Sequence, residues 1–263
     1  ERHRHGATVP VSIVLNSVTK VAAGLLVCIL LAAGSAPAGA DALRDLCLSQ
    51  GHPDFAFGDG RLPESAQPLF GCAARSGARG DADEQVIEGL ADGAPDDFSM
   101  ARALIRLGWK WVGMRKPGSA MNRFNLAWRF APDDGDVYHG IAVTMSELGQ
   151  PTEAVDYWFS LAVSKTQGRP GRFADYGRYM VANRRHEEAR PVLIRALELE
   201  PGNAWAMMYL ADVHFWLEER KQGCAMILRI LEASPPAGFP QVEFDKLMDH
   251  WRNRAAVASC PMR

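Results

Sequence analysis

The chain has 263 residues, of which 48% are hydrophobic and 23% are charged, so it can bury a core large enough for one or two domains. Its formal net charge is −2, which leaves no basic field to attract nucleic acid. These values favour a near-neutral globular protein and argue against a nucleic-acid-binding one.

The first 40 residues have the three parts of a secretory signal peptide. Basic residues precede the apolar run VAAGLLVCILLAA (residues 21–33), and a small-residue segment comes after it and ends at Ala40. The run is shorter than the roughly 20 residues needed to span a bilayer. We predict a signal peptide over residues 1–40, cleaved after Ala40 or after Ala38, and a periplasmic or secreted protein without membrane insertion after its removal. An uncleaved N-terminal anchor is the alternative.

Four cysteines remain beyond the predicted cleavage point, and an even number suits disulfides in the oxidising compartment that an exported protein enters. Four cysteines allow three pairings. The local pairing, Cys47 with Cys72 and Cys224 with Cys260, is favoured because short loops close at lower entropic cost. None of these cysteines has C-x-x-C spacing, so neither a zinc site nor a thioredoxin-like motif is indicated.

Residues 41–95 differ in composition from residues 96–263, because they are rich in Gly, Pro, Asp and Ser. We expect an irregular leader segment with short helices around 42–48 and 84–90. The leader is expected to be stapled by Cys47–Cys72 and to lie with one end on the segment that begins near Ala101. Partial disorder is the alternative.

From Ala101 onward the sequence repeats with a period of about 34 residues. One extra residue near 167–169 shifts the register. In each copy, positions 4, 7, 8 and 11 share one face of a first helix, and positions 20, 24 and 27 share one face of a second. Small residues at positions 8 and 20 let the two helices approach closely, and proline at position 32 ends the second helix. The four copies cover about residues 101–134, 135–168, 170–203 and 204–237.

The first and third copies carry the pattern most completely. Positions 8, 20, 27 and 32 are Gly108, Ala120, Ala127 and Pro132 in the first copy, and Gly177, Ala189, Ala196 and Pro201 in the third. The second copy has Thr166 at the proline position, and the fourth has Gly223 in place of alanine. Over roughly residues 101–237 this pattern resembles the tetratricopeptide repeat family. The resemblance implies an all-α fold, a right-handed α-solenoid of about four helix hairpins, with the repeat domain at 96–237.

Residues 238–263 are predicted to form a capping helix and tail. Apolar residues recur there at helical spacing, namely Phe244, Leu247, Met248 and Trp251. The terminal unit of a repeat stack has to cover the apolar face of its last neighbour. A helix here would also bring Cys260 toward Cys224.

The sequence contains no convincing catalytic arrangement: it lacks a G-x-S-x-G elbow, a G-x-x-x-x-G-K-[ST] phosphate loop and an H-E-x-x-H motif. The run HEE at 186–188 is interpreted as surface charge near a helix N-terminus. His214 is interpreted as a packed core histidine, and the acidic run DDGD at 133–136 as the cap of the next helix. We therefore expect no enzyme activity, no metal and no cofactor.

In the family that the chain resembles, the first helices of the repeats line a concave groove. The resemblance implies that a partner binds there, and the predicted groove residues are Arg102, Arg106, Trp109, His139, Asp175, Arg178, Trp205, Tyr209, Asp212 and Trp216. Arginine and aromatic residues are favoured at binding hot spots. Packing of the aromatic residues from 205 to 216 beneath the capping helix is the alternative. Asp175 and Tyr209 stand where clamp-forming family members have Asn or Arg, which argues against a carboxylate clamp.

The resemblance thus implies a non-catalytic adaptor or scaffold of the periplasm or cell envelope that binds a protein or peptide partner. One alternative is an enzyme or small-ligand binder that uses the groove, for which Asp136, His139 and Glu147 are the clearest candidates. A self-associating structural protein is another. The sequence leaves the partner, the oligomeric state and the disulfide pairing open.

Overall fold

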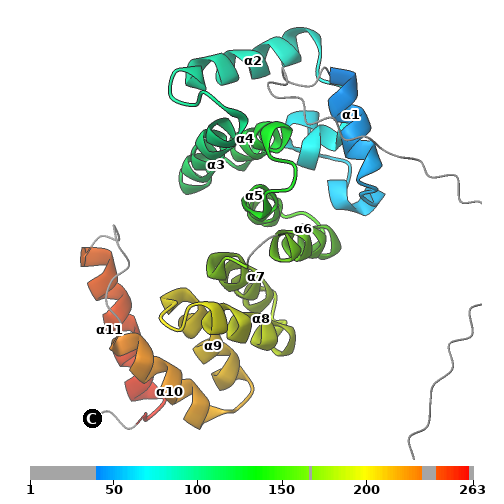
Figure 1. Ribbon diagram of the computed structural model, residues 1–263. Coiled ribbons are helices and arrows are strands. Elements are labelled where there is room, and N and C mark those ends of the chain that lie inside the picture. Colours follow the sequence, from blue (N-terminus) through cyan, green and yellow to red (C-terminus); the bar gives the residue numbers. More distant parts are fainter. Residues whose placement is uncertain (1–39, 166–167, 233–240, 261–263) are drawn as a thin grey trace, which may run out of the picture. The chain divides into compact units, whose positions relative to one another are not determined.

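The computed structural model describes residues 40–165, 168–232 and 241–260, and all regular structure in these ranges is helical (Figure 1). Residues 1–39, which hold nearly all of the predicted signal peptide, and Thr166 of the second copy lie outside the described residues. Within the described ranges, none of the helices combines the length and the apolar character that a membrane crossing requires.

Eight of the helices form consecutive hairpins, as the period of about 34 residues predicts. Each hairpin packs a first helix against a second, and each second helix packs against the next first helix. The pairs are α3 (Asp97–Gly113) with α4 (Pro117–Phe130), α5 (Gly135–Glu147) with α6 (Thr152–Ser164), α7 (Pro170–Ala182) with α8 (His186–Leu199), and α9 (Ala204–Trp216) with α10 (Arg220–Leu231). The fold is therefore an α-solenoid of helical hairpins.

The first hairpin begins earlier than the repeat pattern indicates. Helix α3 starts at Asp97 rather than near Ala101, because Asp96 caps it. The Asp96 carboxylate accepts a hydrogen bond from the backbone N–H of Ser99 at 2.7 Å, and the Ser99 hydroxyl oxygen accepts one from the backbone N–H of Asp96 at 3.1 Å. This reciprocal arrangement satisfies two N–H groups that would otherwise lack partners.

Small residues lie where helices touch: Gly108 and Gly177 stand at position 8 of their copies, whereas Gly140 stands at position 6 of the second copy and is not part of the repeat pattern. A Cβ atom added to Gly108 of α3 would lie 2.6 Å from the ring of Phe124, and one added to Gly140 of α5 would lie 2.2 Å from the same ring. Phe124 of α4 is thus wedged between two helices that approach it because they lack side chains there. In the third copy, Leu193 stands in the same relation to Gly177, at 2.4 Å from an added Cβ.

The turns inside the four hairpins share one backbone geometry that the sequence pattern did not predict. Each contains a residue with positive φ, and only one of these residues is glycine: Arg115 (φ 55), Gly149 (φ 64), Arg184 (φ 61) and Glu218 (φ 61). In each turn the next residue donates its N–H to the carbonyl five positions earlier, for example Lys116 to Trp111 at 3.0 Å. This is a Schellman closure, whose hydrogen bonds offset the roughly 1–2 kcal/mol that a non-glycine residue costs in this region.

The leader forms α1 (Ala40–Ser49), three 3₁₀ turns (Asp54–Phe57, Glu64–Ala66 and Pro68–Cys72) and α2 (Gly77–Ala91), so α1 and α2 include the two predicted short helices. It is anchored to the second helices of the first two hairpins. The indole N–H of Trp158 in α6 donates to the backbone oxygen of Ala56 at 2.6 Å. The buried amide of Asn125 in α4 donates to the oxygen of Gln67 at 2.8 Å and accepts from the N–H of Leu69 at 2.7 Å.

Two disulfides, Cys47–Cys72 and Cys224–Cys260, have the local pairing that the sequence favours. The first joins α1 to the last 3₁₀ turn of the leader. The second ties the residue just beyond the C-terminal helix α11 (Gln241–Val257) back to α10. Helix α11 packs on α10 and shares a separate small core with α9, formed by Met207, Met208, Ala211, Cys224, Ile227, Ile230, Met248, Trp251, Ala255 and Cys260. The side chain of Phe244, predicted to belong to the apolar stripe, lies outside the described residues.

Candidate partner-binding groove

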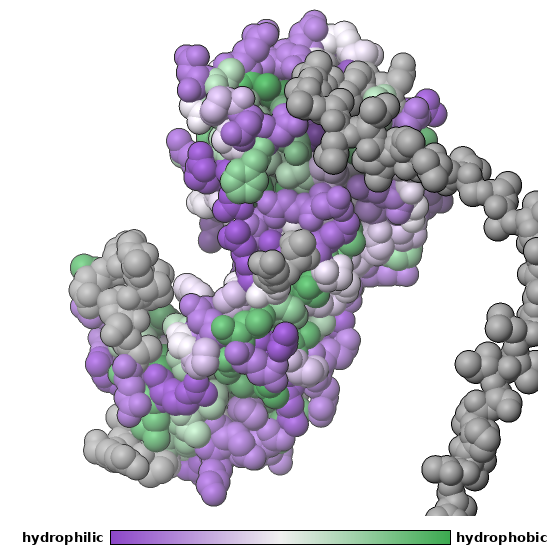
Figure 2. Space-filling view, in the orientation of Figure 1, coloured by the Kyte–Doolittle hydropathy of each residue, from purple (hydrophilic) through white to green (hydrophobic). Residues whose placement is uncertain are grey.

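The predicted groove residues all lie on the first helices of the hairpins: α3 carries Arg102, Arg106 and Trp109, α5 carries His139, α7 carries Asp175 and Arg178, and α9 carries Trp205, Tyr209, Asp212 and Trp216. These helices also pack against one another in order, α3 with α5, α5 with α7 and α7 with α9. Residues at matching positions therefore succeed each other from one hairpin to the next. The surface in Figure 2 mixes hydrophilic and hydrophobic residues.

Direct contacts connect part of this set. The rings of Trp109 and His139 lie 4.9 Å apart, and His139 Nε2 lies 2.9 Å from a carboxylate oxygen of Asp175. The other Asp175 oxygen accepts a hydrogen bond from Arg178 Nε at 3.3 Å. Four side chains from three hairpins thus form one contact chain, whereas Arg106 is exposed on α3.

A hollow of about 380 Å³ opens where this chain of contacts meets α9. Four predicted groove residues line it, Asp175, Arg178, Trp205 and Tyr209, together with Gly171, Ala174 and Asn203. Asn203 was not predicted from the sequence; its side-chain oxygen caps α9 by accepting from the N–H of Ala206 at 2.9 Å. The hollow offers a carboxylate, a guanidinium, an amide and two aromatic rings side by side.

The last two predicted residues, Asp212 and Trp216, line a neighbouring hollow of about 320 Å³ with Val181, His186, Phe215 and Arg254. Arg254 reaches it from α11 and pairs with Asp212 at 2.8 Å. His186 corrects the interpretation of the HEE run as surface charge: Glu187 and Glu188 are exposed, but His186 is 8% exposed and stacks on Trp216 at 4.3 Å.

Among the described side chains, the core that α11 shares with α9 does not include the tryptophans of α9. Beneath α11 lie Met207, Met208 and Ala211. Trp205 and Trp216 keep 43% and 57% of their surface exposed.

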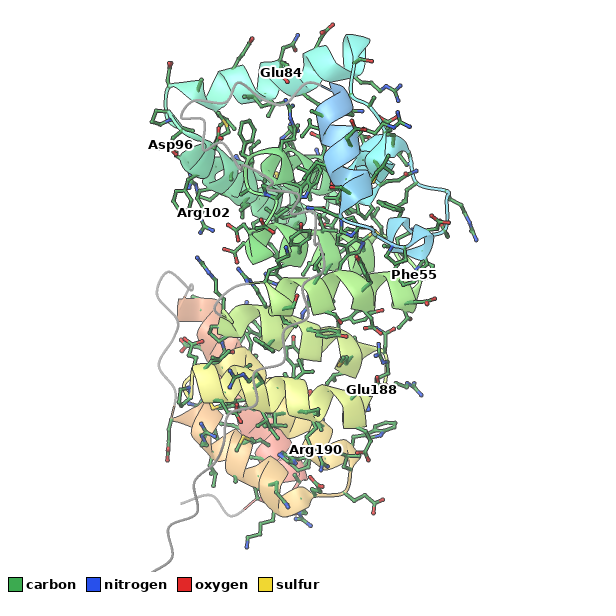
Figure 3. The ribbon with its side chains drawn as sticks, turned by 45° about the vertical axis from the view of Figure 1, so that its right-hand side comes forward. Phe55, Glu84, Asp96, Arg102, Glu188 and Arg190 are labelled. Atoms are coloured by element: carbon green, nitrogen blue, oxygen red, sulfur yellow. A yellow bond between two sulfur atoms is a disulfide. The ribbon has the colours of Figure 1, made fainter. Side chains whose placement is uncertain are left out.

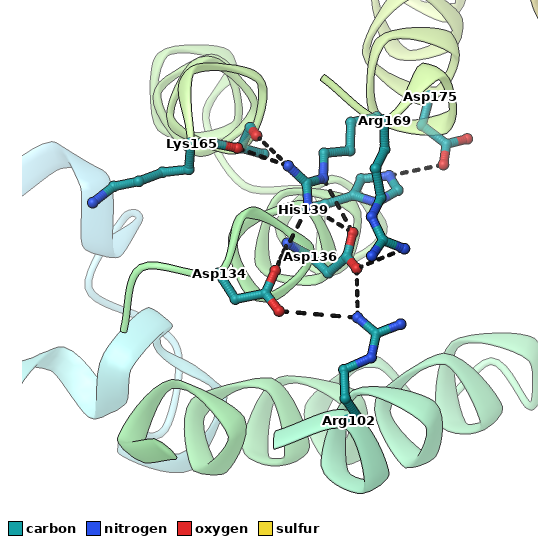
Figure 4. Close-up of polar contacts among 9 residues, drawn as sticks. Arg102, Asp134, Asp136, His139, Lys165, Arg169 and Asp175 are labelled. Atoms are coloured by element: carbon teal, nitrogen blue, oxygen red, sulfur yellow. Dashed lines mark hydrogen bonds and ion pairs between the residues drawn. The ribbon is translucent and has the colours of Figure 1, made fainter. Parts of the chain in front are cut away.

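A buried ion-pair network lies beside the predicted groove residues and was not predicted from the sequence. The Asp136 carboxylate accepts from Arg102 Nη1 at 2.7 Å and from Arg172 Nη2 at 2.9 Å, and Arg169 Nη1 lies 3.3 Å away (Figure 4). Asp136 therefore does not cap α5; Asp134 does, by accepting from the N–H of Asp136 at 2.8 Å. The sequence did contain a signal for the Arg102–Asp136 ion pair, because these oppositely charged residues stand at the second position of adjacent copies.

Two of the three groups considered for a catalytic role are engaged by partners. Asp136 is bound by arginines, His139 is bound by Asp175, and Glu147 is exposed in the last turn of α5. Within the described ranges, no group of three or more His, Cys, Asp or Glu side chains is placed to hold a metal ion.

The carboxyls of Asp136 and Asp175 make the fold sensitive to acid. Burial by itself raises the pKa of each carboxyl, but hydrogen bonds and nearby positive charges outweigh this effect and lower both pKa values below the usual 3.8. The groups that lower the pKa of Asp136 are Arg102 and Arg172. Those that lower the pKa of Asp175 are His139 and Arg178. A lowered pKa in the folded state adds stability above the unfolded value and loses it as the pH falls through the folded value.

We therefore expect the free energy of unfolding to decline on acidification below about pH 4. Urea unfolding at a series of pH values measures this decline. It should be shallower for Asp175→Asn, which removes one of the two carboxyls. A variant with the same pH dependence as the unmodified chain would contradict the assignment.

The fold and the row of first-helix residues define the class of protein: an α-solenoid built from short helical hairpins. Residues 170–236 match the family model described as Tetratricopeptide repeat. This match covers the third and fourth hairpins and, together with the hairpin architecture, supports the tetratricopeptide repeat family for this region. Such repeats are protein-interaction modules, and their proteins are generally non-catalytic scaffolds.

Several solved structures are similar to this chain. The APC/C hetero-tetramer Cut9-Hcn1 has a TM-score of 0.50 and 14% identity, covering 66% of this chain and 33% of that one. PilF of Pseudomonas aeruginosa has a TM-score of 0.49 and 19% identity, covering 60% of this chain and 71% of its own. YrrB, a TPR protein with an unusual peptide-binding site, has a TM-score of 0.46 and 19% identity, covering 66% and 84%. At these identities the likeness concerns the fold alone. No curated protein matches the chain.

Proposed function

We propose that this chain is a non-catalytic adaptor of the periplasm or cell envelope that binds a partner polypeptide along its first helices. The observation that carries the proposal is the hollow of about 380 Å³ between α7 and α9, where Asp175, Arg178, Trp205 and Tyr209 converge. Arginine and aromatic side chains dominate the binding energy of protein interfaces. A polypeptide offers side chains that the two aromatic rings can cover and acceptor groups that the Arg178 guanidinium can bind.

Two features favour the envelope as the compartment. The described chain contains two disulfides, which form and persist in oxidising compartments. The sequence before Ala40 has the pattern of a secretory signal peptide. The contact chain from Trp109 to Arg178 extends the binding surface beyond the hollow, so the partner would lie across several hairpins.

Site-specific photo-cross-linking in intact cells tests the proposal. A photoreactive amino acid at Arg106 or Arg178 is expected to capture the same partner protein. The same probe at Glu153 or Arg195, exposed on the second helices α6 and α8, serves as the control and should capture none. Capture from the second helices alone would overturn the proposal.

Once the partner is identified, its affinity for Tyr209→Ala is expected to fall about tenfold or more, as is typical of a buried aromatic hot spot. Phe55→Ala is the matched control, because Phe55 is an aromatic residue of the leader that is 40% exposed (Figure 3). Binding measured by titration calorimetry should be unchanged in this control. Equal affinities for the two variants would contradict a role for the α7–α9 hollow.

A further inference from the structure

A separate hollow of about 580 Å³ lies between the leader and α4, and none of the predicted groove residues lines it. Helix α2 is held over this part of α4 by Glu84, which pairs with Arg129 at 2.7 Å (Figure 3). The polar side chains of the hollow come from both sides: Ser65, Arg75, Arg79 and Asp83 from the leader, and Ser119, Asn122 and Arg123 from α4.

The charges on the leader side are paired with each other. Arg75 donates to Asp83 at 2.8 Å and to Glu64 at 2.7 Å, and Arg79 donates to the second oxygen of Glu64. The second oxygen of Asp83 accepts from the amide of Asn122 at 3.3 Å. Both carboxylates are therefore engaged by partners other than Arg123.

Among the described arginines, Arg123 alone is partly buried and lacks an ion-pair partner. It is only partly exposed, it has no carboxylate within ion-pair distance, and its Nε is buried without a hydrogen-bond partner. Its Nη1 donates to the neutral side chain of Asn122. The other described arginines without a carboxylate partner are all exposed, namely Arg44, Arg106, Arg115, Arg184, Arg220 and Arg229.

A partly buried guanidinium without a counter-charge is unfavourable, because burial removes hydration that no anion replaces. Burial lowers the pKa of Arg123, while the negative charge of Asp83 opposes this only in part. The guanidinium groups of Arg75, Arg79 and Arg123 and the carboxylate of Asp83 line the hollow, and Glu64, which pairs with Arg75 and Arg79, adds a second carboxylate nearby. One positive charge is left over, and it is that of Arg123.

The same wall of the hollow offers neutral donors. Helix α4 begins at Pro117, its N-cap residue Lys116 supplies no side-chain cap, and the first-turn residues Gly118 and Ser119 line the hollow. Unsatisfied N–H groups at the start of a helix favour a negative charge. Arg123 lies one turn further along the same helix, so its guanidinium and the N–H groups of the first turn can donate to the same bound group.

We propose that this hollow binds an oxyanion, a phosphate or carboxylate group, with Arg123 as its charged anchor and the first turn of α4 and the hydroxyl of Ser119 as further donors. A guanidinium pairs with either group through two parallel hydrogen bonds. The site lies on the leader side of the first hairpin and does not depend on the proposed groove. It would give the adaptor a second contact, with an acidic segment or with free phosphate.

Thermal unfolding of the full chain under oxidising conditions tests the proposal with inorganic phosphate as the probe. A ligand that binds only the folded state raises the unfolding midpoint as its concentration increases. The midpoint should rise in phosphate relative to chloride at the same ionic strength. Arg123→Gln should abolish the rise, whereas Arg252→Gln, which removes an exposed arginine of α11, should retain it.

An acetylated hexaglutamate peptide, titrated against the same variants, separates carboxylate from phosphate as the preferred group. Arg123→Gln should weaken the preferred probe about tenfold or more, since a hydrogen bond to a charged group is lost. Arg123→Lys keeps the positive charge but cannot form two parallel hydrogen bonds, so it should bind with intermediate affinity. This variant also tests the proposal if Arg123→Gln fails to fold. Absence of saturable binding by both probes, or equal binding by Arg123→Gln and the unmodified chain, would overturn the proposal.

Discussion

Replacement of Asp136 by alanine is expected to lower the free energy of unfolding by about 3–5 kcal/mol, the loss typical when one partner of a buried ion pair is removed. Arg172, which Asp136 binds at 2.9 Å, is only 2% exposed. Arg172 also donates to the backbone oxygens of Ala162 and Lys165, at 3.2 and 2.8 Å, and Asp134 Oδ1 lies 3.6 Å from its Nη2. Removal of the Asp136 carboxylate therefore takes the nearest counter-charge away from a buried cation and leaves the more distant Asp134 carboxylate beside it.

Urea unfolding measures the free energy of unfolding of Asp136→Ala, and Asp133→Ala serves as its control. Asp133 lies three residues away, but its side chain is 82% exposed and it pairs only with Lys165, so its loss should cost less than about 1 kcal/mol. Arg172→Leu added to Asp136→Ala should recover much of the stability, because an apolar replacement of both partners is often neutral. Similar losses for Asp133→Ala and Asp136→Ala would show that the network is not a major source of stability.

The second large effect is expected for Trp158→Ala, at about 3–5 kcal/mol, the range measured when large buried aromatics are truncated. Trp158 is fully buried in α6 and stacks on Tyr138 with ring centroids 5.9 Å apart. Its indole also donates to the oxygen of Ala56, so the substitution leaves that leader carbonyl without its donor. The loss should reach both the second hairpin and the leader.

Trp158→Phe separates these two contributions, because it keeps most of the ring and removes only the indole N–H. Its loss in urea unfolding should be clearly smaller than that of alanine. Limited proteolysis under native conditions should show faster cleavage within residues 50–63 for both variants. Unchanged cleavage in Trp158→Ala would mean that the hydrogen bond to Ala56 does not anchor the leader.

The repeat structure was predictable because its causes are local. Gly108 and Gly177 are small where a neighbouring phenylalanine ring or leucine needs the space, and both stand at position 8 of their copies. The disulfide pairing was also favoured correctly, since short loops close most easily. The same period placed the predicted groove residues on the first helices.

The side chains that could not be predicted from the sequence depend on partners in other hairpins or in the leader. Asn125 is a polar residue in an apolar stretch, and its role appears only when residues 67 and 69 lie against α4. Arg172 and His186 look like surface residues until Asp136 and Trp216 cover them. Arg123 is notable only because Asp83 and Glu64 are already engaged by other arginines.

The sequence by itself determined the helical hairpins and their number, because close packing restricts residue size at regular intervals. Only the tertiary structure decided which charges are paired, which aromatic residues stay exposed beside α11, and where an arginine lacks a counter-charge. Pairing and burial depend on side chains that come together from different hairpins and from the leader, and no spacing along one helix encodes those distances.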